Sequence, residues 1–474
     1  ALLKQWAMKL AQLPEWLYEE SYQVVGDMAE TIALLLPEPT HSSQKTLAQW
    51  MQEMAELKSM EEEDKEQYVL QAWQSLGKRE RFVFNKLIGG SFRIGVSQKI
   101  MVKALAIHTQ KPESELAHRL MGNWSPQNTT YDELLNSPYD TDKSKPYPFY
   151  LAYPVDEAEE LGLHPDKWQA ERKWDGIRGQ LIKREDQLFI WSRGEELVTD
   201  KYPELEALKD QLPNGIAIDG ELLPFKDGQP LNFHELQRRI GRKTVGKKLL
   251  KDVPVILQSY DLLEYEGQDI RELPLEERRR KLEALVEQAS HPNLRLSELL
   301  SFQNISDLAA IREDSRAYFS EGLMLKRKDS TYKVGRKRGD WWKWKVDPLV
   351  IDAVLIYAMK GHGRRANLYT DYTFAVWKGD ELVPFAKAYS GLTDEEFRKV
   401  DRFVKANVVE KFGPVRSIKP ELVFEIAFEG IAESSRHKSG ISLRFPRMSR
   451  WRTDKKASEA NTLADLRGML EVYG

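Results

Sequence analysis

The sequence predicts a multidomain protein with three regions of different class: all-α over residues 1–140, mixed α/β over residues 149–347, and a β-barrel over residues 348–474. The chain has 474 residues, enough for about three domains of ordinary size. Apolar residues recur at three- and four-residue steps up to about residue 125, β-rich runs then alternate with helical patterns, and strand patterns dominate from residue 349.

Composition indicates a water-soluble globular protein, with 41% hydrophobic and 31% charged residues. No apolar run approaches the length of a membrane span. The N-terminus lacks the basic-then-apolar pattern of a secretory signal. We therefore expect no membrane partner.

The chain has no cysteine, which excludes disulfides, thiolate zinc sites and a cysteine nucleophile. Its eight histidines show no zinc-binding spacing such as H-E-x-x-H. Any metal is therefore expected on carboxylates, which favours Mg²⁺ or Mn²⁺ over Zn²⁺.

The net charge of −3 is unevenly distributed. Acidic residues cluster in 51–66, whereas residues 236–251, 326–345 and 436–456 are strongly basic. Local basic faces are what bind phosphate backbones, so the net charge does not exclude a nucleic-acid partner.

The first region contains helical patterns over residues 16–36, 47–57, 68–73 and 82–87. Gly89 and Gly90 are expected to end one helix, and Ser97 to cap the next over 98–106. Arg93 lies in the turn between them, where a cation and free backbone amides suit a phosphate backbone. On this turn alone, an ordinary interhelical connection is the simpler interpretation.

Loop-forming residues at 124–148 mark a boundary, after which the second region alternates strands and helices. Strands are expected over residues 179–182, 187–191, 215–223, 253–263 and 322–327. Helices are expected over residues 204–211, 232–240, 275–288 and 305–320.

The third region has strand patterns over residues 350–358, 372–377, 381–390 and 422–429. One helix, 393–408, interrupts them. A small barrel with a single helix fits this order.

The second region contains Lys-Trp-Asp-Gly-Ile-Arg at residues 173–178. This pattern predicts Lys173 at the mouth of a strand, with a sharp turn at Gly176. A lysine nucleophile must lose a proton, and burial or nearby cations favour that loss. For an isolated motif, a surface lysine beside a turn is the simpler interpretation.

Polar motifs follow at expected strand ends. Ser-Arg-Gly-Glu at 192–195 points Arg193 outward, or is only a hairpin turn. Asp-Gly-Glu at 219–221 can hold a ribose hydroxyl or a cation. Tyr260 can stack on a base, although a core tyrosine fits equally well.

Two further patterns carry cations. Glu321 precedes a strand, and Trp-Trp-Lys-Trp-Lys at 341–345 places Lys343 and Lys345 on one strand face. Their mutual repulsion makes sense if an anion lies between them. The last pattern is the basic segment 447–455. Its alternative interpretation is a charged tail that is exposed to solvent and has no function at the site.

Together these motifs supply a nucleophilic lysine, carboxylates for a metal, cations for a phosphate and an aromatic for a base, which are the parts of nucleotidyl transfer. In their order (K-x-D-G-x-R, S-R-x-G, D-G-E, Y-D-L-L, E-G-L-M-L-K, W-x-K-x-K, R-x-D-K) they resemble the ATP-dependent DNA ligases of the covalent nucleotidyltransferase superfamily. The resemblance covers nearly the whole chain and includes the F-R-I-G segment at 92–95.

The resemblance implies an α-helical DNA-binding domain (1–140), an adenylation or nucleotidyltransferase domain (149–347) and an OB-fold domain (348–474). Lys173 would be the catalytic nucleophile that takes AMP from ATP. Glu221 and Glu321 would bind Mg²⁺ or Mn²⁺, and Glu171 would lie beside adenine through its backbone. The residues expected to contact ATP or AMP are Glu171, Arg178, Arg193, Glu221, Tyr260, Lys337, Lys343, Lys345, Arg450, Arg452 and Lys455. Arg336 and Arg338 compete with Lys337 for the phosphate. Together with Asp454, the residues Arg450, Arg452 and Lys455 would orient the leaving pyrophosphate of the first step.

DNA contacts are expected from Arg93, Arg193, Arg242 and Lys243. The last two lie in Gly-Arg-Lys-Thr-Val-Gly-Lys-Lys at 241–248, which nearly matches a phosphate-binding P-loop. Lys248 replaces the required Ser or Thr, and a helical pattern precedes the segment instead of a strand. A basic loop that touches DNA and a solvated loop are about equally good interpretations.

The resemblance further implies sealing of 5′-phosphate/3′-hydroxyl nicks in duplex DNA by a monomer that encircles it, in repair, replication or recombination. A cytoplasmic location is expected, with nucleoid association if the source is prokaryotic. The helical extension argues against an RNA ligase or a capping guanylyltransferase. The absence of cysteine argues against an NAD-dependent ligase, and the intact motifs argue against a non-catalytic DNA-end-binding protein.

Overall fold

A computed structural model describes residues 2–89, 92, 96–121, 124–136, 143–155, 162–242, 245–361 and 368–474. Two compact units result: residues 1–95 with 348–474, and residues 96–347. Arg93 and Lys243 lie outside the described residues, as does most of the F-R-I-G segment. The expected domain boundaries stay predictions.

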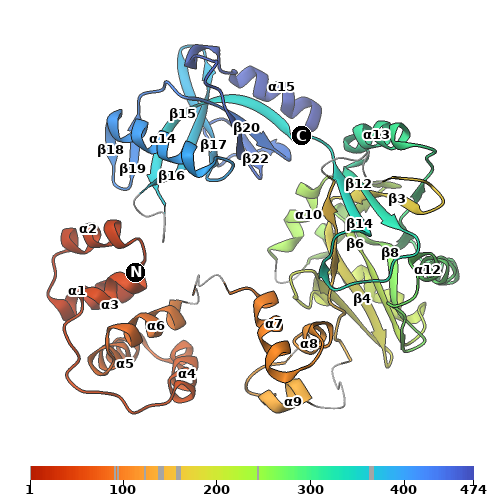
Figure 1. The fold of residues 1–474 in the computed structure, drawn as a ribbon, viewed down its shortest axis with the longest axis horizontal. Coiled ribbons are helices and arrows are strands. Elements are labelled where there is room, and N and C mark those ends of the chain that lie inside the picture. Colours follow the sequence, from red (N-terminus) through yellow and green to blue (C-terminus); the bar gives the residue numbers. More distant parts are fainter. Residues whose placement is uncertain are drawn as a thin grey trace. The chain divides into compact units, whose positions relative to one another are not determined.

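The N-terminal part of the first unit is entirely helical in the described residues (Figure 1). Its helices are α1 (Leu2–Ala11), α2 (Glu15–Val25), α3 (Met28–Leu35), α4 (Leu47–Glu56), α5 (Glu62–Ser75) and α6 (Lys78–Gly89). The helical pattern over 16–36 corresponds to two helices, α2 and α3: Gly26 adopts φ 75°, and Asp27 caps α3 by accepting a hydrogen bond from the Glu30 N–H. Trp6, Trp73 and Phe84 belong to one core beneath these helices.

The C-terminal part of the first unit is a curled antiparallel sheet, consistent with the expected OB-fold. Its strands are β15 (Leu349–Lys360), β16 (Tyr369–Lys378), β17 (Glu381–Ala388), β18 (Val408–Phe412), β19 (Val415–Ile418), β20 (Val423–Phe428) and β23 (Arg447–Trp451), with β21 (Gly430–Glu433) and β22 (Ile441–Arg444) as a separate pair. β15 pairs with β16 along one edge and with β19 and β20 along the other. The Met448 N–H donates to the Ser390 carbonyl at 3.0 Å, which brings β23 to the end of β17.

Two helices accompany this sheet, α14 (Asp394–Ala406) and α15 (Leu463–Tyr473), so the expectation of one helix was wrong. Thr462 caps α15 and Leu466 is fully buried. The basic segment expected near the C-terminus forms strand β23 instead of a solvated tail.

The second unit opens with α7 (Gln98–Thr109), α8 (Glu113–Arg119) and α9 (Tyr131–Asn136). Ser97 caps α7 as predicted, since its side chain accepts a hydrogen bond from the Ile100 N–H. Val102, Leu116 and Leu135 form a small core between these helices.

Two sheets follow. The first has the order β10 (Leu294–Leu296), β8 (Val255–Tyr265), β6 (Ile216–Lys226), β4 (Ile177–Arg184), β5 (Gln187–Ser192), with β7 (Gln229–Pro230) and β9 (Gln268–Asp269) beside β6 and β8. The second has the order β11 (Leu299–Leu300), β3 (Trp168–Trp174), β12 (Ser320–Arg327), β14 (Trp341–Lys345), β2 (Tyr153–Pro154). A short pair joins β1 (Tyr150–Leu151) to β13 (Gly335–Arg336).

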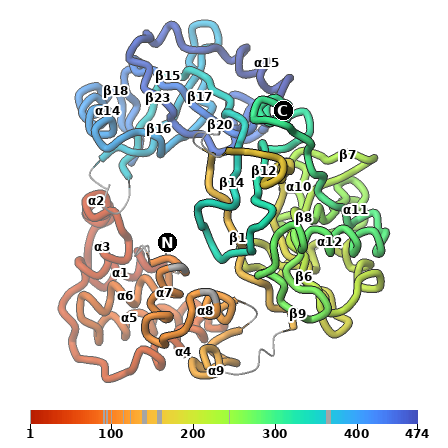
Figure 2. The backbone as a smooth tube through the Cα atoms, turned by 45° about the vertical axis from the view of Figure 1, so that its right-hand side comes forward, coloured from red at the N-terminus to blue at the C-terminus, as the bar shows by residue number. Residues whose placement is uncertain are grey.

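In the described residues, the helices that accompany these sheets are α10 (Phe233–Ile240), α11 (Lys247–Asp252), α12 (Leu275–Ala289) and α13 (Ile305–Glu313). The segment expected as a helix over 204–211 forms a 3₁₀ helix, Pro203–Asp210, and residues after α13 form another, Asp314–Tyr318. α12 packs on β8 (Figure 2). A fully buried ion pair fixes this contact, with Arg278 Nε 2.8 Å from Asp261 Oδ1.

Within the described residues, no helix combines the length and apolar character needed to cross a membrane.

Gly322 allows β12 to approach β14 closely. Its φ is 134°, and a Cβ there would lie 2.2 Å from the Trp344 carbonyl oxygen. We predict that Gly322→Ala destabilises the protein by roughly 2–5 kcal/mol, because it adds backbone strain and a backbone clash. Urea unfolding would measure this loss. Gly241→Ala is the matched control, since no atom lies within 4 Å of its added Cβ; equal stability of the two variants would contradict the prediction.

Candidate active site

The chain crosses from the second sheet to the first between Lys173 and Ile177, where β3 ends and β4 begins. Gly176 packs against β6 at this crossing. A Cβ on it would lie 2.5 Å from the Leu222 carbonyl oxygen and 2.8 Å from Glu221 Cγ. The sequence explained this glycine by a sharp turn alone. The structure adds a second reason, because a residue with a Cβ could not approach β6 this closely.

Lys173 forms an ion pair with Glu321 on the neighbouring strand β12. Its Nζ donates a hydrogen bond to Glu321 Oε2, and Lys345 Nζ on β14 lies 3.2 Å from the same oxygen. Burial alone would raise the pKa of Glu321, but the charges of Lys173 and Lys345 lower it to about 2. Glu321 is therefore an ionised carboxylate between two lysines.

Glu221 has the opposite electrostatic environment. Burial raises the pKa of its carboxyl to about 8, although Lys173 and Arg178 act to lower it. Glu221 and Tyr260 lie in the middle of the long strands β6 and β8, so their expected positions at strand ends were wrong. The ladder between these strands shifts register near Asp219 and Gly220.

Lys343 and Lys345 both lie on β14, as predicted, and the register of β14 against β12 places Lys345 opposite Gly322. Burial lowers the pKa of Lys343, and the charges of Arg336, Lys173 and Lys345 lower it further. An anion bound beside these lysines would offset the repulsion among the neighbouring positive charges. Arg336, Lys337 and Arg338 all have exposed side chains, and the charge of Arg336 is the one that acts on Lys343; which of the three contacts the phosphate stays a prediction.

Glu171 and Lys326 form a second ion pair that the sequence did not reveal. Lys326 Nζ lies 2.8 Å from Glu171 Oε1, and both side chains are only 2% exposed. The same ammonium lies 4.4 Å from the centre of the Tyr260 ring. Lys326 and Gln169 both donate hydrogen bonds to the Glu171 carboxylate. The Glu171 side chain is therefore part of the packed interior beside Tyr260.

Arg178 is held inside the unit. Its Nη2 lies 2.7 Å from Asp219 Oδ2, and its Nη1 donates to the Tyr150 carbonyl at 2.7 Å. Tyr332 donates its hydroxyl to Asp219 at 2.6 Å and completes the cluster. The expected contact of Arg178 with ATP or AMP stays a prediction.

Arg193 and Arg242 have exposed side chains at the ends of β5 and α10. The Arg193 backbone N–H donates to the Arg178 carbonyl at 2.9 Å, which ties this turn to β4. Arg242 Nε donates to the Arg238 carbonyl at 3.1 Å. Both positions are open to solvent, and their DNA contacts stay predictions.

Arg450, Arg452 and Lys455 lie in the other unit, on β23 and the turn after it. Arg452 contacts Asp352 and Asp454, and its hydrogen bond to Asp454 is the main cause of its raised pKa. Lys455 also contacts Asp352, whereas Arg450 is 61% exposed and 3.6 Å from Glu425. Their expected contact with pyrophosphate stays a prediction.

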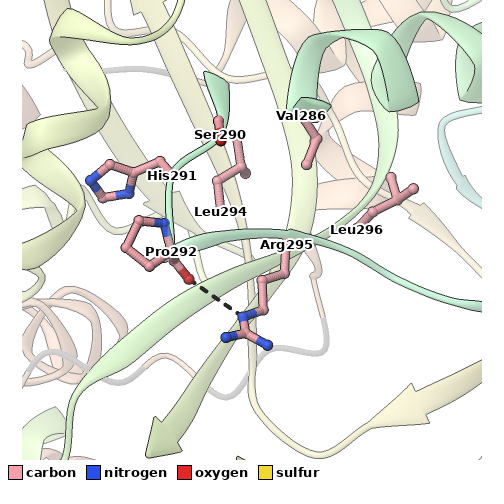
Figure 3. A pocket seen from close by; sticks show the side chains of 7 residues that line it. All are labelled: Val286, Ser290, His291, Pro292, Leu294, Arg295 and Leu296. Carbon is pink, nitrogen blue, oxygen red and sulfur yellow. Dashed lines mark hydrogen bonds between the residues drawn. The ribbon is translucent and has the colours of Figure 1, made fainter. Parts of the chain in front are cut away.

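A surface groove lies on another part of the second unit, between the end of α12 and β10 (Figure 3). Ser290, His291, Pro292 and Arg295 line it together with Val286, Leu294 and Leu296. Arg295 Nε donates to the Pro292 carbonyl at 3.4 Å, and its guanidinium lies over the Phe225 ring. None of the predicted site residues lines this groove, so the charge cluster around Glu321 is the better candidate site.

The described residues contain no group of three or more His, Asp or Glu side chains arranged to hold a metal. Mg²⁺ commonly binds one or two protein carboxylates together with substrate phosphates. Glu321, an ionised carboxylate, fits that chemistry, and Glu221 would fit it after losing the proton that its raised pKa retains.

Comparisons with known proteins agree with this architecture. The family model described as "DNA ligase N terminus" matches residues 1–106, "ATP dependent DNA ligase domain" matches residues 150–345, and "ATP dependent DNA ligase C terminal region" matches residues 365–455.

Two curated relatives align with most of the chain. A "Probable DNA ligase" of Koribacter versatilis is 34% identical, over 80% of this chain and 70% of the relative. A "DNA ligase" of Thermococcus fumicolans is 29% identical, over 98% of this chain and 85% of the relative. The solved structure named "Pmar-Lig_Pre." has the same fold, with TM-score 0.64, 16% identity and 95% coverage of both chains. The chain belongs to the ATP-dependent DNA ligases.

Proposed function

We propose that this ligase joins 5′-phosphate and 3′-hydroxyl ends at nicks in duplex DNA through a covalent lysyl-AMP intermediate on Lys173. The observation that supports this proposal most directly is the arrangement around Glu321, whose carboxylate lies between Lys173 and Lys345. A primary amine, a carboxylate and a second cation therefore lie within one cluster, as the proposed reaction requires.

In the first step, the Lys173 Nζ attacks the α-phosphorus of ATP. A bond from nitrogen to phosphorus forms, the bond from the α-phosphorus to the bridging oxygen breaks, and pyrophosphate leaves. The amine must first lose the proton that it donates to Glu321 in the ion pair. Lys343, Lys345 and Arg336 would neutralise the α-phosphate as charge develops on it.

In the second step, an oxygen of the DNA 5′-phosphate attacks the same phosphorus, and Lys173 leaves. In the third, the 3′-hydroxyl attacks the activated 5′-phosphate, AMP leaves, and the phosphodiester is complete. Because transfer at phosphorus depends chiefly on positioning and charge neutralisation, fixed cations on adjacent strands suit all three steps.

Glu321 and Glu221 would hold the divalent cation, Mg²⁺ or Mn²⁺. When bound, such a cation would neutralise charge on the phosphate oxygens. Tyr260 would stack on adenine, with Glu171 beside the base and Arg178 near the ribose. The Lys326 ammonium against the Tyr260 ring supports this assignment, because it fixes the aromatic plane.

DNA contacts would come from exposed cations such as Arg193 and Arg242, together with Arg93 and Lys243. Such contacts to the phosphate backbone do not depend on sequence, and affinity should fall with salt. We further propose a monomer that encircles nicked DNA, with a DNA-binding domain (1–140), an adenylation domain (149–347) and an OB-fold domain (348–474) that reorients between adenylation and sealing. Repair, replication and recombination all generate such nicks.

Incubation with α-labelled ATP and magnesium should attach label to the protein in an acid-labile bond. Lys173→Ala should remove the label, and so should Lys173→Arg, which keeps a cation beside Glu321. Lys167→Ala, at an exposed lysine nearby, is the control that should keep it. Label on either Lys173 variant would show that another residue is the nucleophile.

Replacement of Glu321 should abolish adenylation, because Lys173 and Lys345 would then repel each other without a carboxylate between them. We expect Glu321→Ala to slow the formation of labelled protein by at least about 100-fold. Glu283→Ala removes a half-exposed carboxylate from α12 and should leave the rate unchanged. A Glu321 variant with the rate and magnesium dependence of wild type would refute this role.

Glu221 should make stability depend on pH. Its pKa is about 8 in the folded protein and near 4.5 when unperturbed, so the folded state holds a proton that the unfolded state releases. This contribution is complete below pH 4.5 and is lost as pH rises through about 8. The Tm of wild type should therefore fall relative to that of Glu221→Gln between pH 5 and pH 9. A constant difference would contradict the shifted pKa.

A further inference from the structure

Two cations of the C-terminal segment contact Asp352, a buried acid on β15 that is 7% exposed. Arg452 Nη1 lies 3.1 Å from its Oδ1 and 2.8 Å from its Oδ2. Lys455 Nζ lies 2.6 Å from the same Oδ2. One carboxylate therefore binds two of the three cations that are expected to orient the leaving pyrophosphate.

Asp352 itself is fixed to the wall of the barrel. Its backbone N–H donates to Asn461 Oδ1 at 2.9 Å, and its carbonyl accepts from the Asn461 N–H at 3.0 Å. In the sheet it pairs with Glu425 of β20. The carboxylate thus projects from rigid backbone, whereas Lys455 lies in the turn after β23.

Arg452 lies between two carboxylates. Its Nη1 contacts Asp352, while its Nε and Nη2 contact Asp454 at 2.9 and 2.7 Å. Arg450 offers a contrast, since its side chain is 61% exposed and its acidic neighbour lies 3.6 Å away. Arg452 and Lys455 are therefore preorganised as a pair, and Arg450 is not.

Two cations held this close would repel each other if the acid between them were absent. A carboxylate on rigid backbone offsets that repulsion and keeps both groups in one orientation. An incoming polyphosphate then meets a formed pair and does not have to order two long side chains, each of which would lose rotamer freedom.

We propose that Asp352 is a positioning residue for the step in which ATP reacts and pyrophosphate leaves. It acts through Arg452 and Lys455 and touches neither the nucleotide nor the DNA. This inference rests on the proposed function, because it assigns Asp352 to one step of that reaction. It follows that Asp352 is needed whenever pyrophosphate leaves or attacks, and is not needed when the 3′-hydroxyl displaces AMP.

The test separates these steps. Enzyme adenylation is measured with α-labelled ATP, its reversal with pyrophosphate added to the adenylated enzyme, and the last step with AMP-free enzyme on a nick that already carries AMP on its 5′-phosphate. We expect Asp352→Asn to slow adenylation and its reversal by about 10- to 100-fold. Sealing of the pre-adenylated nick should stay within about twofold of wild type, since no pyrophosphate takes part.

Asp401→Asn is the matched control. Asp401, on α14 of the same unit, is 4% exposed. It accepts a hydrogen bond from the Tyr369 N–H at 3.0 Å and forms an ion pair with Lys405. Within the described residues, neither Arg452 nor Lys455 is among its hydrogen-bond or ion-pair partners. It should affect Tm as Asp352→Asn does while leaving adenylation unchanged. If Asp352→Asn does not fold, Asp352→Glu keeps the charge at a displaced position and should show the same selective loss.

Wild-type adenylation by a folded Asp352 variant would overturn the inference. Equal loss of adenylation and of pre-adenylated nick sealing would also overturn it, because that outcome marks a purely structural residue. Failure of the proposed function is a different result, in which the wild-type protein itself forms no labelled adduct.

Discussion

The charge balance at Glu321 is the interaction on which the proposed active site depends. Three neighbouring strands supply it in spatial order: Lys173 from β3, Glu321 from β12 and Lys345 from β14. The acid occupies the middle strand, so each lysine reaches it from one side. Strand order therefore decides which cations meet, although 148 residues separate Lys173 from Glu321 in the chain.

The same principle recurs in the C-terminal barrel. Asp352 lies between Arg452 and Lys455 as Glu321 lies between Lys173 and Lys345. In each case a largely buried carboxylate stabilises cations that would otherwise repel each other. Groups held in this way can bind phosphate oxygens without being reordered first, which is what charge neutralisation at phosphorus requires.

Predictions from the sequence agree with the structure at positions where a local pattern decides the structure. The alternation of tryptophan and lysine on β14 follows from the two-residue period of a strand, and the cap at Ser97 follows from side-chain chemistry. Strand β3 was not predicted because its residues, Trp-Gln-Ala-Glu-Arg-Lys-Trp, are mostly polar or charged, and its inward side chains belong to the site. The pairs of Glu171 with Lys326 and of Arg178 with Asp219 depend on strand register between distant segments, which no single-sequence pattern encodes.

The buried ion pair of Glu171 and Lys326 also constrains which substitutions can be accepted at these two positions. Loss of either partner leaves an uncompensated charge in the interior, which typically destabilises a protein by about 3–5 kcal/mol. Replacement of both by apolar groups of similar volume is often neutral. A lineage that changes one of these two residues must therefore pass through a less stable protein, unless both positions change together. The two residues are expected to be inherited as a unit, and their joint identity should record which lineages have changed the interior beside Tyr260.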